Sequence, residues 1–178
     1  AEPGDYDDKY IRWRPQDLPI VPTEWKLLVT DSSRQQFETV KELIGKADII
    51  VNAGDPDREG QLLVDEVLYF VGNTKPVQRI LLNALDEKSV KSALGDLRDN
   101  KDFHNLYQSA LARARADWLI GMNLSRAYTL SERYKGNKVT LPIGRVKTPT
   151  LALVVRRERE LADFKPVDYF TVKILYTH

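Results

Sequence analysis

One short apolar run, from Ala47 to Val51, constrains the fold of this chain more than any other feature. It is rich in β-branched residues and ends shortly before Gly54, and residues 59–70 then carry apolar side chains at helical spacing. A short buried strand that leads straight into a helix is typical of α/β proteins, in which helices cover a parallel sheet. The run therefore predicts an α/β layer built around residues 47–70.

The neighbouring segments predict further elements of the same layer. Helical spacing predicts a helix over residues 33–44 that stops at Gly45, and residues 77–82 form a second predicted strand. Asp86 can cap a helix whose apolar positions reach Leu97. The order helix, strand, helix, strand, helix favours a parallel-sheet unit.

The rest of the chain divides into an N-terminal arm and a helical second half. The first thirty residues contain four prolines and scattered aromatic residues and follow neither period, which predicts an irregular packed arm. Residues 103–133 and 145–162 predict two helices, and residues 169–176 alternate like a strand. We expect three parts: an α/β unit over residues 1–100, a mainly α-helical segment over residues 101–165, and a strand entering a further domain over residues 166–178.

Composition narrows the chemistry that the chain can perform. It has 27 Lys and Arg against 26 Asp and Glu, so its formal net charge of +1 gives no overall sign of nucleic-acid binding. The absence of cysteine and the presence of only two histidines exclude disulfides, thiolate zinc sites and His-rich metal sites. No apolar run is long enough to span a bilayer and the N-terminus lacks a signal-peptide pattern, so we expect a cytoplasmic protein without membrane contact.

The first predicted strand is followed by an acidic loop, Asp55-Pro56-Asp57-Arg58-Glu59-Gly60. Open α/β sheets bind their ligands at this carboxyl end of the strands. Three carboxylates so close in sequence repel one another, and their oxygen atoms are the ligands that Mg²⁺ prefers. Asp55, Asp57 and Glu59 are therefore candidate Mg²⁺ ligands, and a solvated turn is the alternative.

The same loop also fits a calcium-binding pattern. Positions 1, 3, 5, 6, 8 and 12 of an EF-hand loop correspond to Asp55, Asp57, Glu59, Gly60, Leu62 and Glu66. An EF-hand is entered from a helix, whereas the residues before this loop are strand-like. The local pattern favours magnesium, with a non-catalytic calcium-binding module as an alternative.

A basic stripe is predicted on the long helix. With Met122, the residues Arg115, Arg126 and Arg133 fall within about 20° of a common line on the helix surface, and Trp118 lies beside them, about 60° away. Cations follow the phosphates of a single DNA strand and a flat ring stacks on its bases, so the stripe predicts single-stranded DNA binding; a solvated helix face is the alternative. Arg113 falls on the opposite face, four residues before Asp117, which predicts an ion pair within the helix.

Two further cations precede the last predicted helix. They are Arg145 and Lys147, and Thr148 with the proline after it can start that helix. Free N–H groups at a helix N-terminus bind phosphate, and the two cations would add to this attraction. Simple capping of the helix is the alternative.

Several motifs together resemble one protein family. Residues 53–61 resemble the acidic motif of the Toprim fold, which topoisomerases share with bacterial primases and some nucleases. Other blocks resemble type IA DNA topoisomerases, most closely the bacterial topoisomerase III branch: residues 6–10 with Trp13, residues 17–22, residues 109–119 with Ser125-Arg126-Ala127, and residues 144–151. The match covers most of the chain. It departs at Lys147, where the family usually has Gln, and at Ala84, where an acid is common.

The resemblance implies a fold and a reaction. The fold would be α/β, a partial Toprim parallel-sheet unit followed by a mainly α-helical DNA-binding segment. The parent enzyme would cut one DNA strand through a phosphotyrosyl intermediate, pass another strand and reseal the first, with Mg²⁺ as cofactor and mainly single-stranded DNA as partner. Asp55, Asp57 and Glu59 would hold the metal, and Glu59 could donate a proton to the leaving oxygen. The implied DNA contacts are Arg115, Trp118, Arg126, Arg133, Arg145 and Lys147.

The same resemblance places two elements outside this sequence. The first Toprim strand, with its metal-associated glutamate, is expected before Ala1, and the nucleophilic tyrosine is expected beyond His178. We therefore expect the chain by itself to be inactive as a topoisomerase. A primase or Toprim nuclease is the alternative within the fold. Such a protein would share the acidic loop but lack the blocks at residues 109–127 and 144–151.

Overall fold

The computed structural model describes residues 1–177 and has a small mixed sheet at its centre. Strand β1 (Ile50–Asn52) pairs in parallel with β2 (Val77–Arg79), so that Asn52 lies opposite Arg79. This confirms the predicted parallel pair. A further strand, β3 (Arg98–Asp99), pairs antiparallel with β2 and was not predicted, because two charged residues carry no period that a sequence pattern could reveal.

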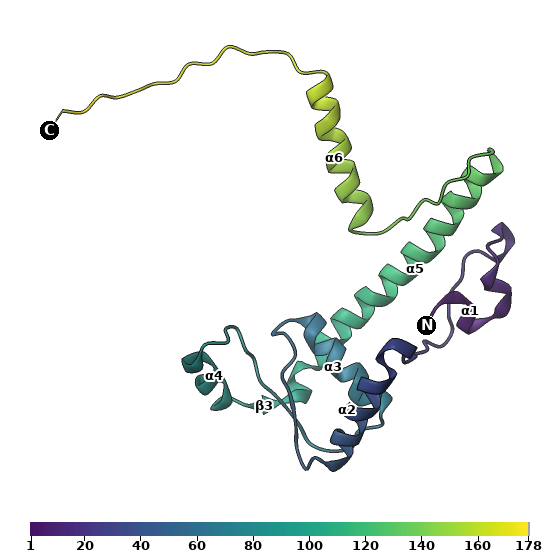
Figure 1. The fold of residues 1–178 in the computed structure, drawn as a ribbon, viewed down its shortest axis with the longest axis vertical. Coiled ribbons are helices and arrows are strands. Elements are labelled where there is room, and N and C mark those ends of the chain that lie inside the picture. The colour runs from purple at the N-terminus through teal and green to yellow at the C-terminus, as the bar shows by residue number, and fades with distance from the viewer. Residues whose placement is uncertain (178) are drawn as a thin grey trace.

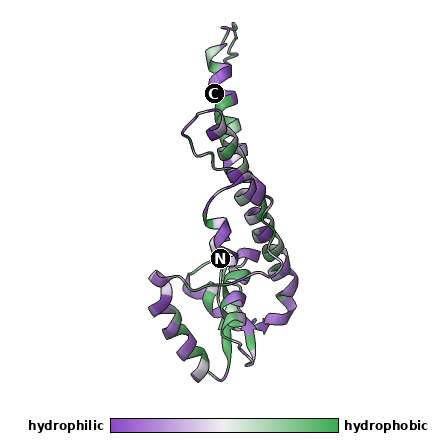
Figure 2. Ribbon diagram, turned by 90° about the vertical axis from the view of Figure 1, so that its right-hand side faces the viewer, coloured by the Kyte–Doolittle hydropathy of each residue, from purple (hydrophilic) through white to green (hydrophobic). Residues whose placement is uncertain are grey.

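Three helices accompany the sheet, and all were predicted within a few residues. They are α2 (Arg34–Lys46), α3 (Arg58–Phe70) and α4 (Glu87–Leu94). Helix α2 runs past its expected stop at Gly45 by one residue. The predicted cap of α4 is present, because the side chain of Asp86 accepts a hydrogen bond from the backbone N–H of Ser89 at 3.0 Å. In Figure 2 green, the colour of hydrophobic residues, is concentrated in the region of the sheet.

The long helix α5 (His104–Tyr134) follows a short 3₁₀ turn, η4 (Asn100–Phe103), and extends well beyond the α/β unit (Figure 1). Its first half packs against α3, where Arg113 pairs with Glu59, and Ala110 in the same half is fully buried. The helix ends before Gly136, whose φ of 91° suits glycine, as the sequence predicts. Helix α5 is therefore the axis along which the other parts of the chain are arranged.

The N-terminal arm lies along the second half of α5. It contains one turn of helix and two 3₁₀ turns: α1 (Pro3–Tyr6), η1 (Asp8–Ile11) and η2 (Pro15–Asp17). A further 3₁₀ turn, η3 (Asp31–Ser33), follows the arm and leads into α2. Asn123 of α5 holds the arm by accepting from the N–H of Ile20 at 2.6 Å and donating to its carbonyl at 2.9 Å. The side chain of Ile20 is buried, which confirms the predicted irregular packed arm.

The C-terminal part projects away from the rest of the molecule (Figure 1). Helix α6 (Lys147–Ala162) starts two residues later than predicted, and none of its described side chains is buried. Residues 164–177 contain no helix or strand, so the strand predicted over residues 169–176 is not formed; a strand needs a neighbour to bond with, and an alternating pattern alone does not supply one. Position 178 lies outside the described residues. No helix of the described chain has both the length and the apolarity needed to cross a bilayer.

Candidate metal and nucleic-acid site

The acidic loop is tightly folded between β1 and α3. A side chain at Gly54 would place its Cβ 2.5 Å from the carbonyl oxygen of Gly60, and a Cβ at Gly60 would clash with the backbone of Asp55. Asp57 caps α3, because its carboxylate accepts from the N–H of Gly60 at 2.8 Å. The backbone N–H of Asp57 also donates to the carbonyl of Asp55 at 2.7 Å. The loop conformation is thus fixed by two glycines, at which the backbone packs too closely for a side chain, and by the Asp57 cap of α3.

Arg79, at the end of β2, holds this loop through hydrogen bonds to its backbone. Its side chain is fully buried, and its guanidinium donates to the carbonyls of Gly54 at 2.7 Å and Asp55 at 2.5 Å. It also donates to Asn52 and to the carbonyl of Ile80. Burial lowers the pKa of Arg79, whereas the nearby aspartates, Asp65 first, raise it. Sequence reasoning gave Arg79 no role; the only signal was an arginine inside an apolar strand.

A polar network connects the loop to the start of α5. The side chain of Asn100 in η4 accepts from Asn52 at 3.1 Å and from Gln61 at 2.8 Å, and it donates to Asp65 at 2.9 Å. Asn52 and Gln61 are buried, so these hydrogen bonds satisfy groups that water does not reach. The network therefore couples the geometry of the acidic loop to the position of α5.

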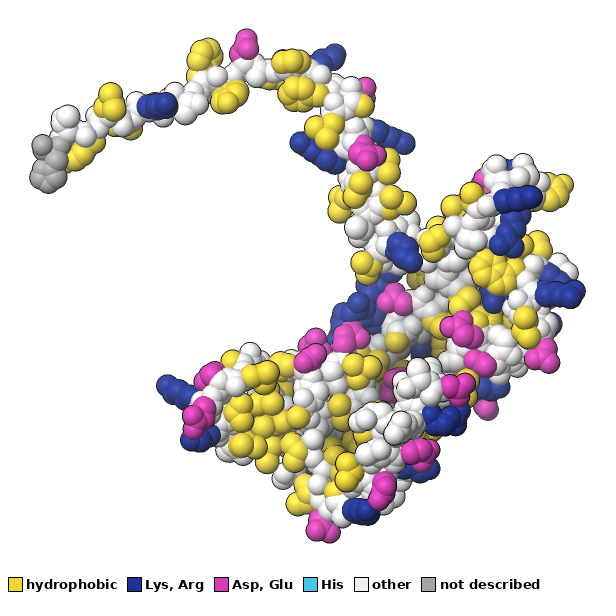
Figure 3. All heavy atoms as spheres, viewed as in Figure 1, with side chains coloured by type: hydrophobic (Ala, Val, Ile, Leu, Met, Phe, Trp, Pro, Cys, Tyr) yellow, Lys and Arg dark blue, Asp and Glu magenta, His cyan; other side chains and the backbone are white. Residues whose placement is uncertain are grey.

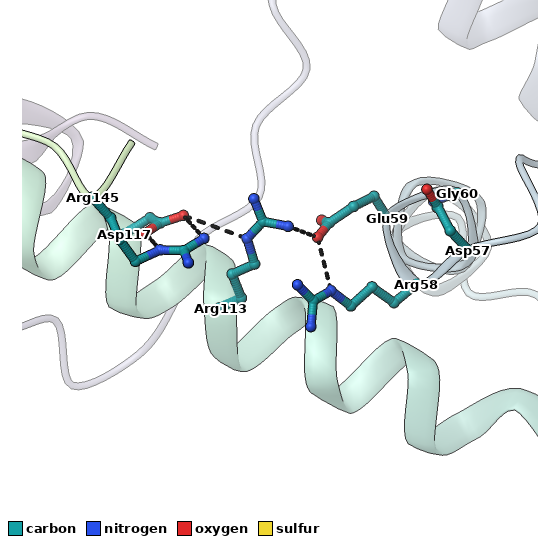
Figure 4. Close-up of polar contacts among 7 residues, drawn as sticks. All are labelled: Asp57, Arg58, Glu59, Gly60, Arg113, Asp117 and Arg145. Carbon is teal, nitrogen blue, oxygen red and sulfur yellow. Dashed lines mark hydrogen bonds and ion pairs between the residues drawn. The ribbon is translucent and has the colours of Figure 1, made fainter. Parts of the chain in front are cut away.

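Glu59 points from the start of α3 toward α5, where a row of alternating charges begins (Figure 4). Its carboxylate accepts from Arg113 of α5 and from the Nε of Arg58 at 3.2 Å. Asp117 lies one turn further along α5, and its Oδ2 is 3.8 Å from the Nε of Arg113. Arg145 closes the row by donating to both oxygens of Asp117, at 2.6 and 3.3 Å. We call Arg58, Glu59, Arg113, Asp117 and Arg145 the charged row.

The segment between α5 and α6 brings Arg145 to this row. It folds back along α5, where the hydroxyl of Ser125 accepts from the N–H of Ile143 at 2.8 Å and Thr129 accepts from the N–H of Leu141 at 2.9 Å. The hydrogen bond from Arg145 lowers the pKa of Asp117, and the nearby Arg113 lowers it further, although burial opposes both. Asp117 therefore stays ionised between two guanidinium groups.

The predicted ion pair within α5 accounts for only part of what Arg113 does. The contact with Asp117 is present at 3.8 Å, but the same guanidinium also donates to Glu59. The spacing within a helix cannot reveal a partner on another helix, so this second contact was missed. Among the predicted phosphate contacts, Arg145 joins the charged row, and Lys147 is the first residue of α6. The hydroxyl of Thr148, the expected helix start, accepts from the N–H of Gly144 at 3.1 Å.

The three acidic side chains of the loop do not converge. Asp57 caps α3 on one side of the helix, and Glu59 extends from another side to two arginines (Figure 4). The described residues contain no group of three His, Cys, Asp or Glu side chains that could hold a metal ion. In this arrangement Asp55, Asp57 and Glu59 do not fit Mg²⁺ coordination, and their assignment as ligands stays a prediction.

The calcium-binding alternative is wrong. The chain enters the acidic loop from strand β1, and α3 begins at Arg58, so most of the twelve positions of an EF-hand loop are helical. Glu66, which would be the last ligand, instead lines a cavity of about 560 Å³ between α3, α5 and the N-terminal arm. An EF-hand loop cannot form on this backbone.

Two arginines of the predicted basic stripe contact the N-terminal arm. Arg126 is only 5% exposed, and it donates to the carbonyl of Tyr10 at 2.8 Å. Its guanidinium lies 5.1 Å from the ring centroid of Trp13, and that of Arg133 lies 5.6 Å from the same ring. These two cations therefore hold the arm in this structure.

The other two members of the stripe face the same arm. The guanidinium of Arg115 lies 5.3 Å from the ring centroid of Trp25, and Trp118 packs edge-on against Trp25 and Tyr6. The indole of Trp118 also donates to the carbonyl of Ala1 at 3.2 Å. The stripe therefore lies on one face of α5, as predicted, but the arm covers that face. DNA binding by its residues stays a prediction.

Comparison with known proteins gives this geometry a context. A family model described as DNA topoisomerase matches residues 101–178, the part that contains α5 and α6. DNA topoisomerase 3 of Vibrio cholerae is 51% identical over 98% of this chain. The enzymes of the same name from Pasteurella multocida and Salmonella typhimurium are each 49% identical over 97% of the chain. The chain belongs to the DNA topoisomerase family. It spans 27% to 28% of the length of these three relatives.

The regions that match topoisomerases include the charged row. The family model contains Arg113, Asp117 and Arg145, and the three relatives align over nearly the whole chain, acidic loop included. This agreement favours a topoisomerase over the alternative of a primase or Toprim nuclease. Sequence comparison thus identifies the family, and the structure shows which side chains meet.

Proposed function

We propose that this chain is the part of a DNA topoisomerase that holds a DNA strand beside the acidic loop. The whole enzyme would cut one strand through a phosphotyrosyl intermediate and reseal it. Support comes from the similarity to proteins named DNA topoisomerase 3 and from the charged row. A cytoplasmic site of action with the bacterial chromosome belongs to the same proposal.

The charged row carries this proposal. Arg58, Arg113 and Arg145 come from three different segments and follow one another along a row that starts at Glu59, just after the loop at the carboxyl end of β1, where α/β sheets bind ligands. A guanidinium group presents paired N–H donors that match the oxygens of a phosphate. Figure 3 shows basic and acidic side chains side by side where α5 leaves the α/β unit. A DNA backbone crossing this point would run from the acidic loop toward the start of α6.

The residues predicted from sequence enter this proposal in two groups. Arg145 and Lys147 lie at or near the row and would bind phosphates directly. The stripe of Arg115, Trp118, Arg126 and Arg133 would bind a single strand only after the N-terminal arm has moved away, because the arm now contacts all four. The preference for single strands rests on this second group.

The described residues show no geometry for magnesium binding or for proton transfer. We propose Mg²⁺ for the whole enzyme on the acidic motif alone, and when bound it would offset phosphate charge. The carboxylates of the loop do not converge among the described residues, so this arrangement does not define a step at the metal. Glu59, the proposed proton donor, forms ion pairs with Arg113 and Arg58 in this structure.

Salt-titrated binding of a short fluorescent single strand tests this proposal. We expect Arg113→Ala and Arg145→Ala each to weaken binding and to reduce the slope of log affinity against log salt by about 0.7 per lost phosphate contact. For Arg113 this reverses the expectation from helix spacing alone. Arg157→Ala is the control, because Arg157 on α6 pairs only with Glu160 at the surface among the interactions described. Equal losses in all three variants would mean that the row is not a specific DNA contact.

A further inference from the structure

Asp117 occupies a position that resembles a bound phosphate. Its two carboxylate oxygens accept from the Nε and Nη2 of Arg145, which is the paired geometry that arginine uses for phosphate oxygens. The Nε of Arg113 lies 3.8 Å from one of these oxygens. One carboxylate is therefore paired with both guanidinium groups on which the proposed DNA contact depends, and Arg113 also donates to Glu59.

The row is accessible to a strand from solvent. The side chains of Arg113, Asp117 and Arg145 are 34%, 38% and 46% exposed. Ion pairs with this exposure are weak, because water and salt compete with them. They are strong enough to orient the arginines and weak enough to be exchanged for another anion. The row as a whole has three guanidinium groups against two carboxylates, a net charge of +1.

We propose that Asp117 is an internal stand-in for a DNA phosphate, which holds Arg145 and Arg113 in place until a backbone phosphate displaces it. This inference rests on the proposed function, because it assumes that the same arginines bind DNA. In the free chain the carboxylate keeps the guanidinium groups oriented. On binding, a phosphate takes the paired donors of Arg145, and Asp117 turns to solvent.

The exchange also has a consequence for α6. The pair between Asp117 and Arg145 joins α5 to the segment that enters α6, and none of the described side chains of α6 is buried. Displacement of Asp117 would therefore transfer Arg145, and with it the start of α6, from α5 to the DNA. Strand binding and the position of α6 would be coupled through one carboxylate.

The test is the affinity of the chain for a short fluorescent single strand after Asp117→Asn, which keeps the size of the side chain and removes its charge. An internal competitor opposes binding, so its removal should tighten binding about two- to fivefold at low salt, the range of an exposed ion pair. Far-ultraviolet circular dichroism checks that helix content is unchanged. Asp117→Ser, which also removes the charge, should behave in the same way.

Two comparisons separate this proposal from a general loss of negative charge. Glu132→Gln removes a charge from the same helix, about four turns away, where Glu132 pairs with Lys135 at 2.7 Å. It should leave the affinity nearly unchanged. Asp117→Asn made in an Arg145→Ala background should give a clearly smaller gain, because only Arg113, whose Nε lies 3.8 Å from Asp117, then remains to be released.

The outcomes are distinguishable from failure of the proposed function. A gain of undiminished size without Arg145, a similar gain from Glu132→Gln, or no gain from Asp117→Asn and Asp117→Ser would overturn the stand-in role. If Arg145→Ala alone binds as tightly as the unchanged chain, the phosphate contact itself is wrong, whatever Asp117 does. A tighter Asp117→Asn variant whose gain shrinks when Arg145 is removed supports both.

Discussion

At the scale of single residues, the most consequential side chain is Arg79. It is fully buried and donates to the backbone carbonyls that shape the acidic loop. Arg79→Met would leave these carbonyls without their donor, so we expect it to lower the free energy of unfolding by at least about 3 kcal/mol. Chemical denaturation followed by circular dichroism measures this loss.

A matched control for this change lies on the next strand. Arg98 is directly opposite Arg79 in the register, but it is exposed and pairs only with Asp96, at 2.6 Å, among the ion pairs described. Arg98→Met should cost less than about 1 kcal/mol. Arg79→Lys keeps the charge without the paired donors, so it should fall between the two. Equal losses at both positions would mean that the loop does not depend on Arg79.

Also at the scale of single residues, Glu66 makes the free energy of unfolding depend on pH. Its burial beside the cavity that Trp25, Tyr107 and Trp118 help to line raises its pKa, and Arg115 opposes this in part. The folded chain then binds this proton more tightly than the unfolded chain does. The resulting stabilisation is complete below the unfolded pKa and is lost as pH rises through the folded pKa.

The variant Glu66→Gln should therefore flatten this part of the pH profile. Because glutamine stays neutral, we expect its thermal midpoint to lie above that of the unchanged chain at neutral pH and to approach it in acid. Thermal unfolding from about pH 4 to about pH 8 measures the difference. Glu38→Gln is the control, since Glu38 is an exposed residue of α2 and pairs with Lys41 at 3.8 Å. A midpoint lowered at neutral pH by Glu66→Gln would contradict the argument.

At the scale of elements, α5 divides its arginines between two tasks. One face carries Arg113 toward the acidic loop, and the other holds the N-terminal arm through Arg126. Arg126→Ala should lower the free energy of unfolding by about 2 kcal/mol, because the carbonyl of Tyr10 loses a charged donor. Arg133→Ala loses only a ring contact with Trp13 among the interactions described, and it should cost less than about 1 kcal/mol. Denaturation followed by tryptophan fluorescence compares the two, and equal costs would mean that the arm does not depend on Arg126.

Most elements were predictable from sequence, whereas their contacts were not. Helix α5 was expected over residues 103–133 and spans His104–Tyr134, because its apolar spacing and a glycine break are local signals. The basic stripe was also placed correctly on one face. What covers that face depends on an arm about one hundred residues distant in sequence, which no helical period encodes. The partners of Glu59 and the role of Arg79 escaped prediction for the same reason.

At the scale of the whole molecule, a packed body contrasts with a projecting end. The α/β unit, the arm and α5 contact one another, whereas α6 and the residues after it extend away (Figure 1). A single helix of this length is marginal in water unless it packs against other elements. The body and the C-terminal end should therefore differ in local stability.

Limited digestion with trypsin should reveal this difference. We expect the first cuts after Arg156, Arg157, Arg159 or Lys173, because a helix that unfolds readily and an extended chain end both expose their backbone to the protease, whereas the proline after Lys165 blocks cleavage there. Arg126 of α5 should resist, since it is buried under the arm. Mass spectrometry of the early products identifies the cut sites, and Arg157→Gln should shift cleavage to the neighbouring basic residues without changing the resistant body. Early cleavage within α5, before any product ending in α6 accumulates, would show that the arm does not protect the long helix.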